Sequence, residues 1–267
     1  MPENLVSYLR LPKKVEKAVS KTGWRYFRMV YGKLDMVTSP TETAVQLLDQ
    51  IGLNKKAVAV SCGIDLKRFN PQNSGDTIRA KFSLPAVPTL LYLGRLDKEK
   101  NVDILLNAFS MLTKKIDAHF VIAGKGAEKE NLEELAKILG IYNKVTFTGF
   151  VGDQELPFIY RVADCFVIGG IAELQSIVTM EAMASGLPVI AVNAMALPEL
   201  VIHEKNGYLF DITEKEKLAD YMFKILSNKT LQKEMSQKSL DFIQKHDIEN
   251  SLSAYENIYR EVSTIHS

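Results

Sequence analysis

The sequence predicts an α/β protein whose larger part is a doubly wound, parallel sheet of six strands, preceded by an incomplete α/β segment. From Thr89 onward, six short and nearly all-apolar runs alternate with longer amphipathic stretches. Runs that are apolar throughout are typical of parallel strands covered by helices on both faces. Ahead of them, only two strand candidates precede a polar stretch at 61–76, which is too few for a sheet that stands alone.

The front of the chain contains mostly helical patterns. Amphipathic stretches at 13–20 and 24–34 precede a short strand, DMVTS. The tetrapeptide SPTE predicts a capping box that begins at Ser39, with Pro40 as the first residue of a helix reaching Gly52. A strand, AVAV, follows, and the Gly-, Pro- and Asn-containing segment SCGIDLKRFNPQNSGD predicts a linker.

The rest of the chain supplies the sheet and its covering helices. The strand candidates are TLLYLG, AHFVIAG, KVTFTGF, DCFVIG, PVIAV and GYLF. We therefore predict a remnant of a first domain at 1–70 and a second domain at 71–267, with the last helix (248–263) packing back on the front part. The other helical patterns lie at 101–115, 128–140, 215–226 and 231–245.

Composition excludes several classes of protein. The net charge of +1 and the 24% of charged residues do not favour a nucleic-acid partner. Cys62 and Cys165 lack a C-x-x-C partner, which favours reduced thiols in a cytoplasmic protein. The four histidines lack the spacing of metal ligands, so we expect no metal site. No window approaches the roughly 18 apolar residues of a membrane span.

Ligands of open parallel sheets bind beyond the carboxyl ends of the strands, so the loops at these ends are the candidate sites. In LGRLDKEKN, Arg95 and Lys100 suit a diphosphate, and the alternative is a solvated charged turn. The next loop contains Gly124, Lys125 and Gly126, the start of a G-x-G-x-x-G pattern with Lys129 in place of the third glycine. It is therefore a weak dinucleotide fingerprint, and a tight turn explains it better.

The third and fourth loops add a base contact and two carboxylates. Val151 can present backbone to a flat base, whereas Asp153 is expected to cap the following helix. GGIAELQS then leads into a helix that begins near Gln175, whose first amides form an anion site. Glu173 and Glu181 flank this start, and carboxylates suit vicinal diols because they accept two hydrogen bonds. The alternatives are a helix cap and a surface residue, but Glu181 stands in an otherwise apolar helix, where unpaired carboxylates are rare.

In this order, the loops resemble those of the retaining glycosyltransferases of family 4 (glycosyl transferases group 1), which have the GT-B fold. The stretches LLYLGRLDKEKNVDILLNAF, FVIAGKGAEKENL, VTFTGFV and LPELVIHEKNGYLF are similar to the loops of that family, and AELQSIVTMEAMASGLPVIA matches its E-x7-E motif. The resemblance covers nearly the whole chain. It implies that 71–267 is the C-terminal, Rossmann-like, nucleotide-sugar-binding domain and that 1–70 belongs to the acceptor-side domain.

The resemblance also implies roles for residues. Arg95 and Lys100 would bind the donor diphosphate and stabilise the leaving group, Glu173 would contact the transferred sugar, and Glu181 would contact the nucleotide ribose. The donor would be a UDP- or GDP-sugar, transferred with retention by a metal-independent hexosyltransferase that requires no cofactor. The remaining contacts would come from Gly124, Lys125, Gly126 and Val151 at the base, and from the amides of Gln175, Ser176 and Ile177 at sugar and phosphate.

Two segments, IGGIAE and AVNAMALPE, depart from the family pattern, and the resemblance implies that the front of the chain holds only part of a first domain. We therefore expect the isolated chain to bind the donor but to be weakly active or inactive. The alternative is a non-catalytic subunit that needs a partner chain or self-association, with Trp24, Phe27 and Val30 exposed. A nicotinamide-dependent oxidoreductase is a third, weaker hypothesis. The acceptor is an unknown sugar or lipid. The basic, apolar stretches YLRLPKKVEK and WRYFRMVYGK can lie at the cytoplasmic face of a membrane, and the alternative is a solvated amphipathic helix.

Overall fold

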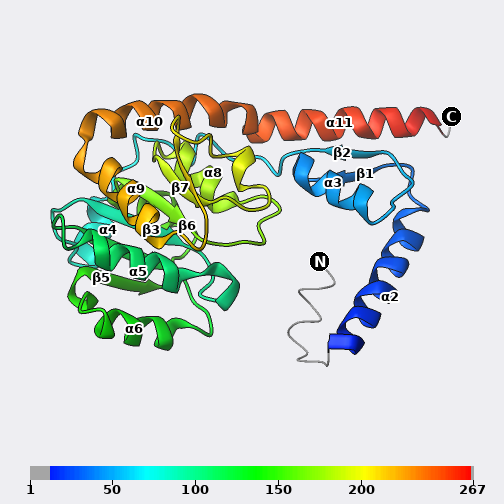
Figure 1. The fold of residues 1–267 in the computed structure, drawn as a ribbon. Helices are drawn as coiled ribbons and strands as arrows, with labels where there is room; N and C mark the ends of the chain where they lie inside the picture. Colours follow the sequence, from blue (N-terminus) through cyan, green and yellow to red (C-terminus); the bar gives the residue numbers. More distant parts are fainter. Residues whose placement is uncertain (1–12, 266–267) are drawn as a thin grey trace. The chain divides into compact units, whose positions relative to one another are not determined.

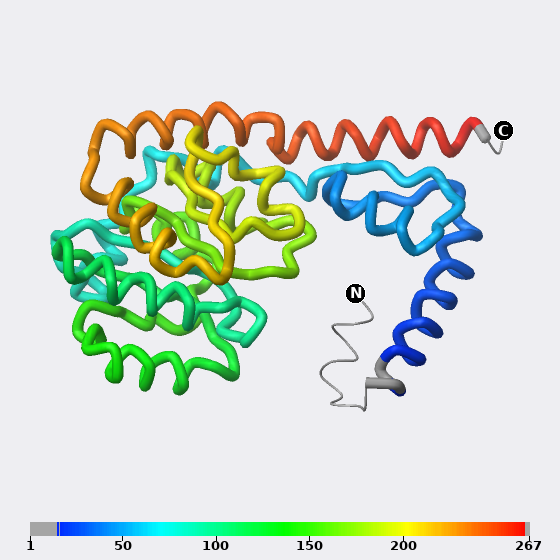
Figure 2. The backbone as a smooth tube through the Cα atoms, in the orientation of Figure 1, coloured from blue at the N-terminus to red at the C-terminus, as the bar shows by residue number. Residues whose placement is uncertain are grey.

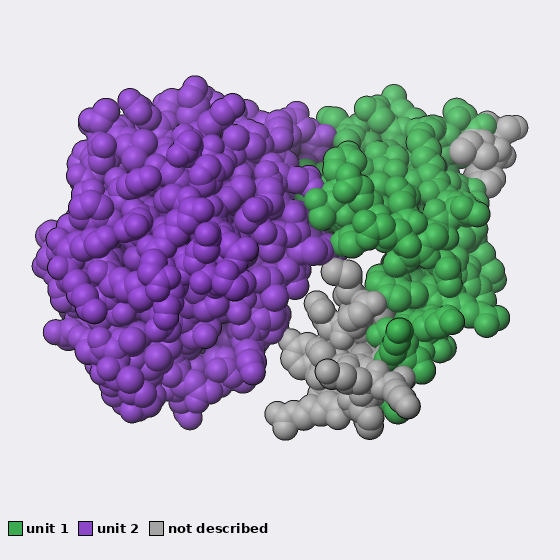
Figure 3. Space-filling view, in the orientation of Figure 1, with its two compact units in different colours: residues 1–61, 252–267 green, residues 62–251 purple. Residues whose placement is uncertain are grey.

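The computed structural model describes residues 13–265 of the chain. Its contacts divide the chain into two compact units, residues 1–61 with 252–267, and residues 62–251 (Figure 3). The domain division expected at residue 70 stays a prediction.

The larger unit contains one sheet of six parallel strands in the order β5-β4-β3-β6-β7-β8 (Figure 1). The chain runs from β3 to the edge strand β5, returns to β6 beside β3, and continues to the other edge. The order therefore reverses between β3 and β6. The strands are β3 (Thr89–Leu93), β4 (His119–Ala123), β5 (Val145–Gly149), β6 (Cys165–Ile168), β7 (Val189–Val192) and β8 (Gly207–Phe210).

Helices cover both faces of this sheet. Leu90, Leu91 and Tyr92 are consecutive in β3 and at most 1% exposed, and consecutive strand residues point to opposite faces. Helix α5 packs against α6 and α9, while α8 packs on β6 and β7 and against α10. The doubly wound fold expected from the sequence is confirmed. The helices of the larger unit, traced in Figure 2, are α4 (Asp76–Lys81), α5 (Val102–Leu112), α6 (Lys129–Ile138), α7 (Leu156–Ile159), α8 (Ile177–Ala184), α9 (Lys215–Ser227) and α10 (Lys229–Ile243). Helix α11 (Ile248–Ile265) begins in this unit, but its residues from Leu252 onward belong to the smaller one.

The segment expected to be a linker is instead a packed part of the larger unit. Ile64 and Phe69 are each 4% exposed and belong to the hydrophobic core. Asp65 Oδ1 accepts hydrogen bonds from the backbone amides of Lys67 and Arg68, at 2.9 Å each. The polar residues of this segment therefore make a turn that delivers two apolar side chains to the core. The linker prediction is wrong for this reason.

The smaller unit contains the front elements. These are α2 (Lys13–Tyr31), β1 (Val37–Ser39), α3 (Glu42–Gln50) and β2 (Ala57–Ala59), with β1 parallel to β2. The two helical stretches expected at 13–20 and 24–34 form one helix, α2. Lys56 forms an ion pair with Glu261 of α11 within this unit, at 2.5 Å. That the front part is the remnant of a domain stays a prediction, as does the packing of the last helix on it.

The predicted capping box is wrong by two residues. The N-cap of α3 is Thr41, whose hydroxyl accepts a hydrogen bond from the Ala44 amide at 3.2 Å. Ser39 cannot cap the helix because it is the last residue of β1, where its carbonyl accepts from the Val60 amide at 2.8 Å. Pairing with a distant strand thus decides which of two hydroxyl residues caps the helix.

No helix in the part of the chain that the structure describes is long and apolar enough to cross a membrane. The beginning of the basic stretch YLRLPKKVEK, for which a membrane surface and a solvated helix are the two alternatives, lies outside the described residues.

Candidate functional site

The candidate site lies where the strand order of the sheet reverses, between the carboxyl ends of β3 and β6. In open α/β sheets, diverging loops leave a crevice at this point, and ligands bind there. Two neighbouring pockets occupy this edge, and they share Leu93, Gly94 and Arg95 in their walls. We call them the switch-point pocket and the strand-exit pocket.

The switch-point pocket has a volume of about 240 Å³. It brings together six predicted site residues from two loops and the start of α8. Arg95 and Lys100 follow β3, whereas the others follow β6. The convergence of two cations with a helix start, expected from the sequence, is present. The pocket is lined by Tyr92, Leu93, Gly94, Arg95, Lys100, Ile168, Glu173, Gln175, Ser176, Ile177 and Val178.

Lys100 and Glu173 form an ion pair across this pocket. The distance from Lys100 Nζ to Glu173 Oε1 is 2.6 Å, and the two side chains are 18% and 16% exposed. Glu173 is therefore not the cap of α8, whose N-cap is Ser176. The pair places a carboxylate where an anionic ligand would meet the ammonium group of Lys100.

Local backbone features bring the two loops together. Asn101 has a left-handed conformation (φ 51°), and its amide group donates to the Gly169 carbonyl at 2.8 Å. A Cβ on Gly170 would lie 2.6 Å from Glu173 Oε1, so a glycine there leaves room for the carboxylate. The β6 loop can consequently lie directly on the turn η1 (Lys98–Lys100).

Arg95 is held at the surface by two carboxylates. Its guanidinium group donates to Asp97 and, at 2.9 Å, to Glu99, and its side chain is 65% exposed. Its carbonyl accepts a hydrogen bond from the hydroxyl of the buried Tyr92 at 2.6 Å. Both predicted phosphate-binding cations are thus paired with carboxylates in this structure, and an anion would have to compete for them.

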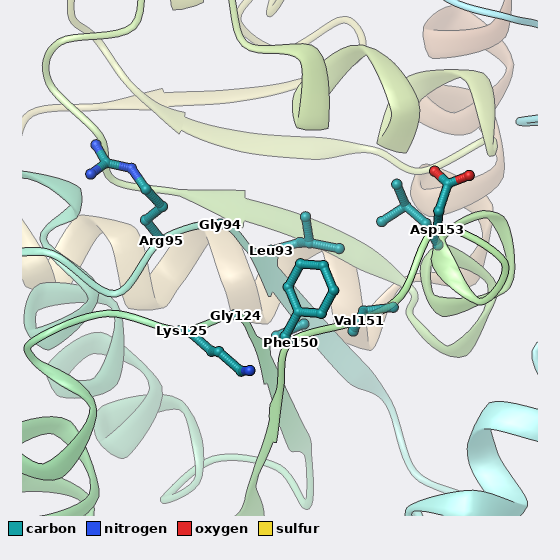
Figure 4. Close-up of a pocket in the computed structure, with 10 residues that line it drawn as sticks. Leu93, Gly94, Arg95, Gly124, Lys125, Phe150, Val151 and Asp153 are labelled. Carbon is teal, nitrogen blue, oxygen red and sulfur yellow. The ribbon is translucent and has the colours of Figure 1, made fainter.

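The strand-exit pocket has a volume of about 400 Å³ (Figure 4). Phe150, which the sequence analysis missed, is 70% exposed, and Lys125 Nζ lies 5.5 Å from the centre of its ring. An exposed ring at a pocket wall offers a stacking surface. In the sequence, Phe150 looks like one more apolar residue at the end of the strand before it. Its exposure, which the sequence does not show, is what makes it a candidate contact. The pocket is lined by Leu93, Gly94, Arg95, Ala123, Gly124, Lys125, Phe150, Val151, Asp153 and Leu156.

The glycines of the β4 loop serve close packing of the backbone. A Cβ on Gly124 would lie 1.8 Å from the Gly94 carbonyl oxygen, and a Cβ on Gly126 would lie 2.2 Å from that of Leu96. The Lys125 carbonyl accepts from the Leu96 amide at 2.8 Å. Gly126 is absent from the walls of both pockets. These contacts agree with the interpretation of this loop as a tight turn.

We had expected Asp153 to cap α7, but it does not. Its carboxylate accepts from Arg68 Nη2 at 2.6 Å, and the residue at the N-cap of α7 is Glu155. The sequence analysis missed Arg68 because it lies in the segment that was taken for a linker. Figure 4 shows Asp153 at the opposite end of the pocket from Arg95.

Glu181 is buried, with an exposure of 7%, so the surface alternative is wrong. Its Oε2 accepts a hydrogen bond from the hydroxyl of Tyr160. Burial raises the pKa of this carboxyl group, an effect that the Tyr160 hydrogen bond and the charge of Arg68 oppose and that of Asp153 reinforces. Glu181 is not in the walls of either pocket. Its contact with a ribose stays a prediction.

The side chains at the start of α8 are occupied within the protein. Gln175 Oε1 accepts from the Cys62 amide at 2.7 Å, and the Ser176 hydroxyl accepts from that of Thr179 at 2.8 Å. A ligand would therefore meet backbone amides here. Among the residues that the structure describes, no group of three or more His, Cys, Asp or Glu side chains could hold a metal ion.

Comparison with known proteins identifies relatives. The family model described as "Glycosyl transferases group 1" matches residues 75–241. A mannosylfructose-phosphate synthase of Agrobacterium fabrum is 31% identical over 76% of this chain and 47% of its own length. A GDP-mannose-dependent alpha-(1-6)-phosphatidylinositol monomannoside mannosyltransferase of Mycobacterium tuberculosis is 36% identical over 61% of this chain and 45% of its own length. The chain spans about half the length of the curated relatives it matches.

A solved structure shows the same fold. The Anabaena protein HepE, crystallised with UDP and glucose, has a TM-score of 0.81 and 21% identity. The match covers 91% of this chain and 67% of that protein.

Proposed function

The chain belongs to the glycosyl transferases group 1 family, and from this premise we propose that it binds a UDP- or GDP-sugar as donor for the transfer of the sugar to an acceptor. The observation that carries the proposal is the switch-point pocket, where Lys100, Arg95 and the start of α8 meet. A diphosphate leaving group develops negative charge, and two cations with the amides of a helix N-terminus stabilise such charge.

We assign different parts of the donor to the two pockets. The diphosphate and sugar occupy the switch-point pocket, where Glu173 accepts from sugar hydroxyls and Lys100 and Arg95 bind phosphate oxygens. The base occupies the strand-exit pocket, against the ring of Phe150 and the backbone at Gly124. This assignment is supported by the shared wall of the two pockets, which allows one ligand to extend through both.

The transfer breaks the bond between the anomeric carbon and the phosphate oxygen and forms a bond to the acceptor oxygen. The proton of the acceptor hydroxyl leaves with the departing diphosphate. Retention of configuration and metal independence are part of the proposal, supported by the E-x7-E spacing of Glu173 and Glu181 and by the two cations that can neutralise the leaving group. Transfer that is unchanged by EDTA is the expected result for metal independence.

A second candidate function is donor binding by a subunit that acts with a partner chain. The observation that favours it is the apolar surface of α2, where Phe27 and Val30 are 37% and 39% exposed and Trp24 is half-buried. The two functions agree on the donor site and differ in turnover. We expect the isolated chain to transfer little sugar, and rapid transfer by the purified protein would contradict that expectation.

Isothermal titration with UDP, UDP-glucose, GDP and GDP-mannose tests donor binding. We expect at least one of them to bind, with an affinity that falls about tenfold or more in Lys100→Ala, because a charged phosphate contact is worth roughly 1.5–3 kcal/mol. The matched control is Lys137→Ala, since Lys137 forms a surface ion pair on α6. The absence of binding heat with all four ligands would overturn the proposal.

A further inference from the structure

Asn101 follows Lys100 directly and lies between the turn η1 and helix α5. Its backbone is left-handed, with φ 51° and ψ 39°. A glycine adopts this conformation without strain, and asparagine is among the few other residues that tolerate it. The side chain of Asn101 does not cap α5. Neither the backbone conformation nor helix capping therefore accounts for the amide group, and its contacts have to.

The amide group of Asn101 joins the two loops that line the switch-point pocket. Its Nδ2 donates to the Gly169 carbonyl in the β6 loop at 2.8 Å and to the Glu99 carbonyl in its own turn at 3.2 Å. These two bonds use both hydrogens of the amide. A Cβ on Gly169 would lie 3.0 Å from the Lys100 carbonyl oxygen, so a glycine there suits the close approach of the two backbones. Asn101 thus attaches the β6 loop to the turn that carries Lys100.

This attachment remains when a donor separates Lys100 from Glu173. In the structure, the ion pair of these two side chains also joins the loops, but a bound diphosphate would take Lys100 away from it. The Ile171 amide donates to the Glu99 carbonyl only at 3.4 Å, which is long for a hydrogen bond. The Glu173 carbonyl accepts from the Ala196 amide at 3.2 Å, which fixes the loop to the segment after β7 and not to Lys100. The 2.8 Å bond is consequently a short link between the two loops that a donor leaves intact.

We propose that Asn101 determines how strictly the site selects the sugar of its donor, an inference that rests on the proposed donor binding. The amide fixes the position of Glu173 relative to the diphosphate, so the carboxylate meets the hydroxyls of one sugar epimer better than those of another. A loosened loop lets the carboxylate follow either epimer. Asn101 is absent from the walls of the switch-point pocket, and it is a positioning residue because it acts through Glu173.

The binding of the diphosphate itself depends less on this bond. Its proposed partners are Lys100, Arg95 and the amides at the start of α8. Helix α8 is buried along most of its length, so packing holds its first turn in place without the help of Asn101. Loss of the amide should therefore change the recognition of the sugar more than that of the nucleoside diphosphate.

The test is isothermal titration of the full chain with two pairs of epimers, UDP-glucose with UDP-galactose and GDP-mannose with GDP-glucose. The readout is the ratio of the two dissociation constants within a pair, which a loss of folded protein does not change. For the nucleotide that binds, we expect a ratio of about tenfold in the wild type and about threefold or less in Asn101→Gly, which lacks the amide but keeps an unstrained backbone. UDP or GDP alone should bind to both proteins with affinities within about twofold of each other.

Three further variants define the role of the amide. Ser83→Gly is the matched control, because Ser83 has the same left-handed backbone (φ 50°) outside the walls of both pockets, and it should keep the wild-type ratio. Asn101→Asp keeps the size of the side chain but lacks the two amide hydrogens, so its ratio should fall as in Asn101→Gly. The double variant Asn101→Gly/Glu173→Ala should have the ratio of Glu173→Ala alone, because Asn101 has no effect once the carboxylate is gone.

The outcomes separate this inference from the proposed function. A wild-type ratio in Asn101→Gly overturns the inference alone, as does equal binding of both epimers by the wild type. A loss of UDP or GDP affinity as large as the loss of selectivity also overturns it, because the amide would then support the whole site. Failure of the wild type to bind any of these nucleotides overturns the proposed function, and this inference with it.

Discussion

The ion pair between Lys100 and Glu173 leads to a prediction about the substitution Glu173→Gln. In the structure, the carboxylate of Glu173 holds the ammonium group that we expect to bind the donor diphosphate. An incoming diphosphate must compete with this carboxylate. The glutamine keeps the size of the side chain and one acceptor oxygen but removes its charge. We therefore expect UDP or GDP to bind more tightly to Glu173→Gln than to the wild type, while sugar transfer declines.

The exposure of the pair sets the size of the effect. An exposed ion pair contributes roughly 0–1 kcal/mol, and removing one partner of a fully buried pair costs about 3–5 kcal/mol. With exposures of 18% and 16%, the Lys100–Glu173 pair lies between these limits. If competition with the diphosphate amounts to about 1 kcal/mol, its loss makes binding about fivefold tighter. The free energy of unfolding should fall by about 1–2 kcal/mol, because Lys100 loses its partner.

Isothermal titration with the nucleoside diphosphate measures the first effect, and urea unfolding measures the second. The gain in affinity should shrink at high salt, which screens the charge of the phosphate. Glu134→Gln is the matched control, because it removes a carboxylate from a surface pair with Lys137. Weaker binding of the diphosphate to Glu173→Gln would refute the reasoning, since it would mean that the carboxylate assists the binding of the anion.

Two further substitutions test the packing and the titration of the larger unit. Gly124→Ala should lower the free energy of unfolding by about 2–4 kcal/mol, because Gly124 has φ +146° and its Cβ would lie 1.8 Å from the Gly94 carbonyl oxygen. Gly152→Ala, where a Cβ meets nothing within 4 Å, should stay within about 0.5 kcal/mol of the wild type in the same urea titration. Burial, aided by the charge of Lys245, lowers the pKa of His246 to about 4. Between pH of about 6.5 and 4, the unfolded chain then binds more protons than the folded chain. The stability contributed by neutral His246 should therefore be complete above this window and be lost as the pH falls through it. Unfolding at pH 7 and at pH 5 should show a smaller loss for His246→Gln, and an equal loss in both proteins would contradict the assignment.

The six strands of the sheet could be predicted because each is a short apolar run between turn residues. Such a run has one favourable place, the interior of a parallel sheet, so its position follows from composition. The capping residue of α3 could not be predicted in the same way. Ser39 and Thr41 both carry a suitable hydroxyl, and the pairing of Ser39 with Ala59 of β2 leaves Thr41 as the cap.

The candidate site likewise has features that could be predicted from the sequence and features that could not. The positions of Arg95, Lys100 and Glu173 in loops at the carboxyl ends of strands followed from the order of the elements, since these ends meet at one edge of a parallel sheet. Their partners did not follow, because partners come from distant segments. Arg68 reaches Asp153 from a segment that was taken for a linker, and Tyr160 reaches Glu181 from another helix.

The fold class, the family and the edge of the sheet where the candidate residues gather could be inferred from the sequence, because they depend on the periodicity and order of residues along the chain. The pairing of charges, the burial of Glu181 and the backbone positions that accept no side chain became visible in the folded chain. These properties depend on distances of a few ångströms between segments that are far apart in sequence, and no local pattern encodes those distances.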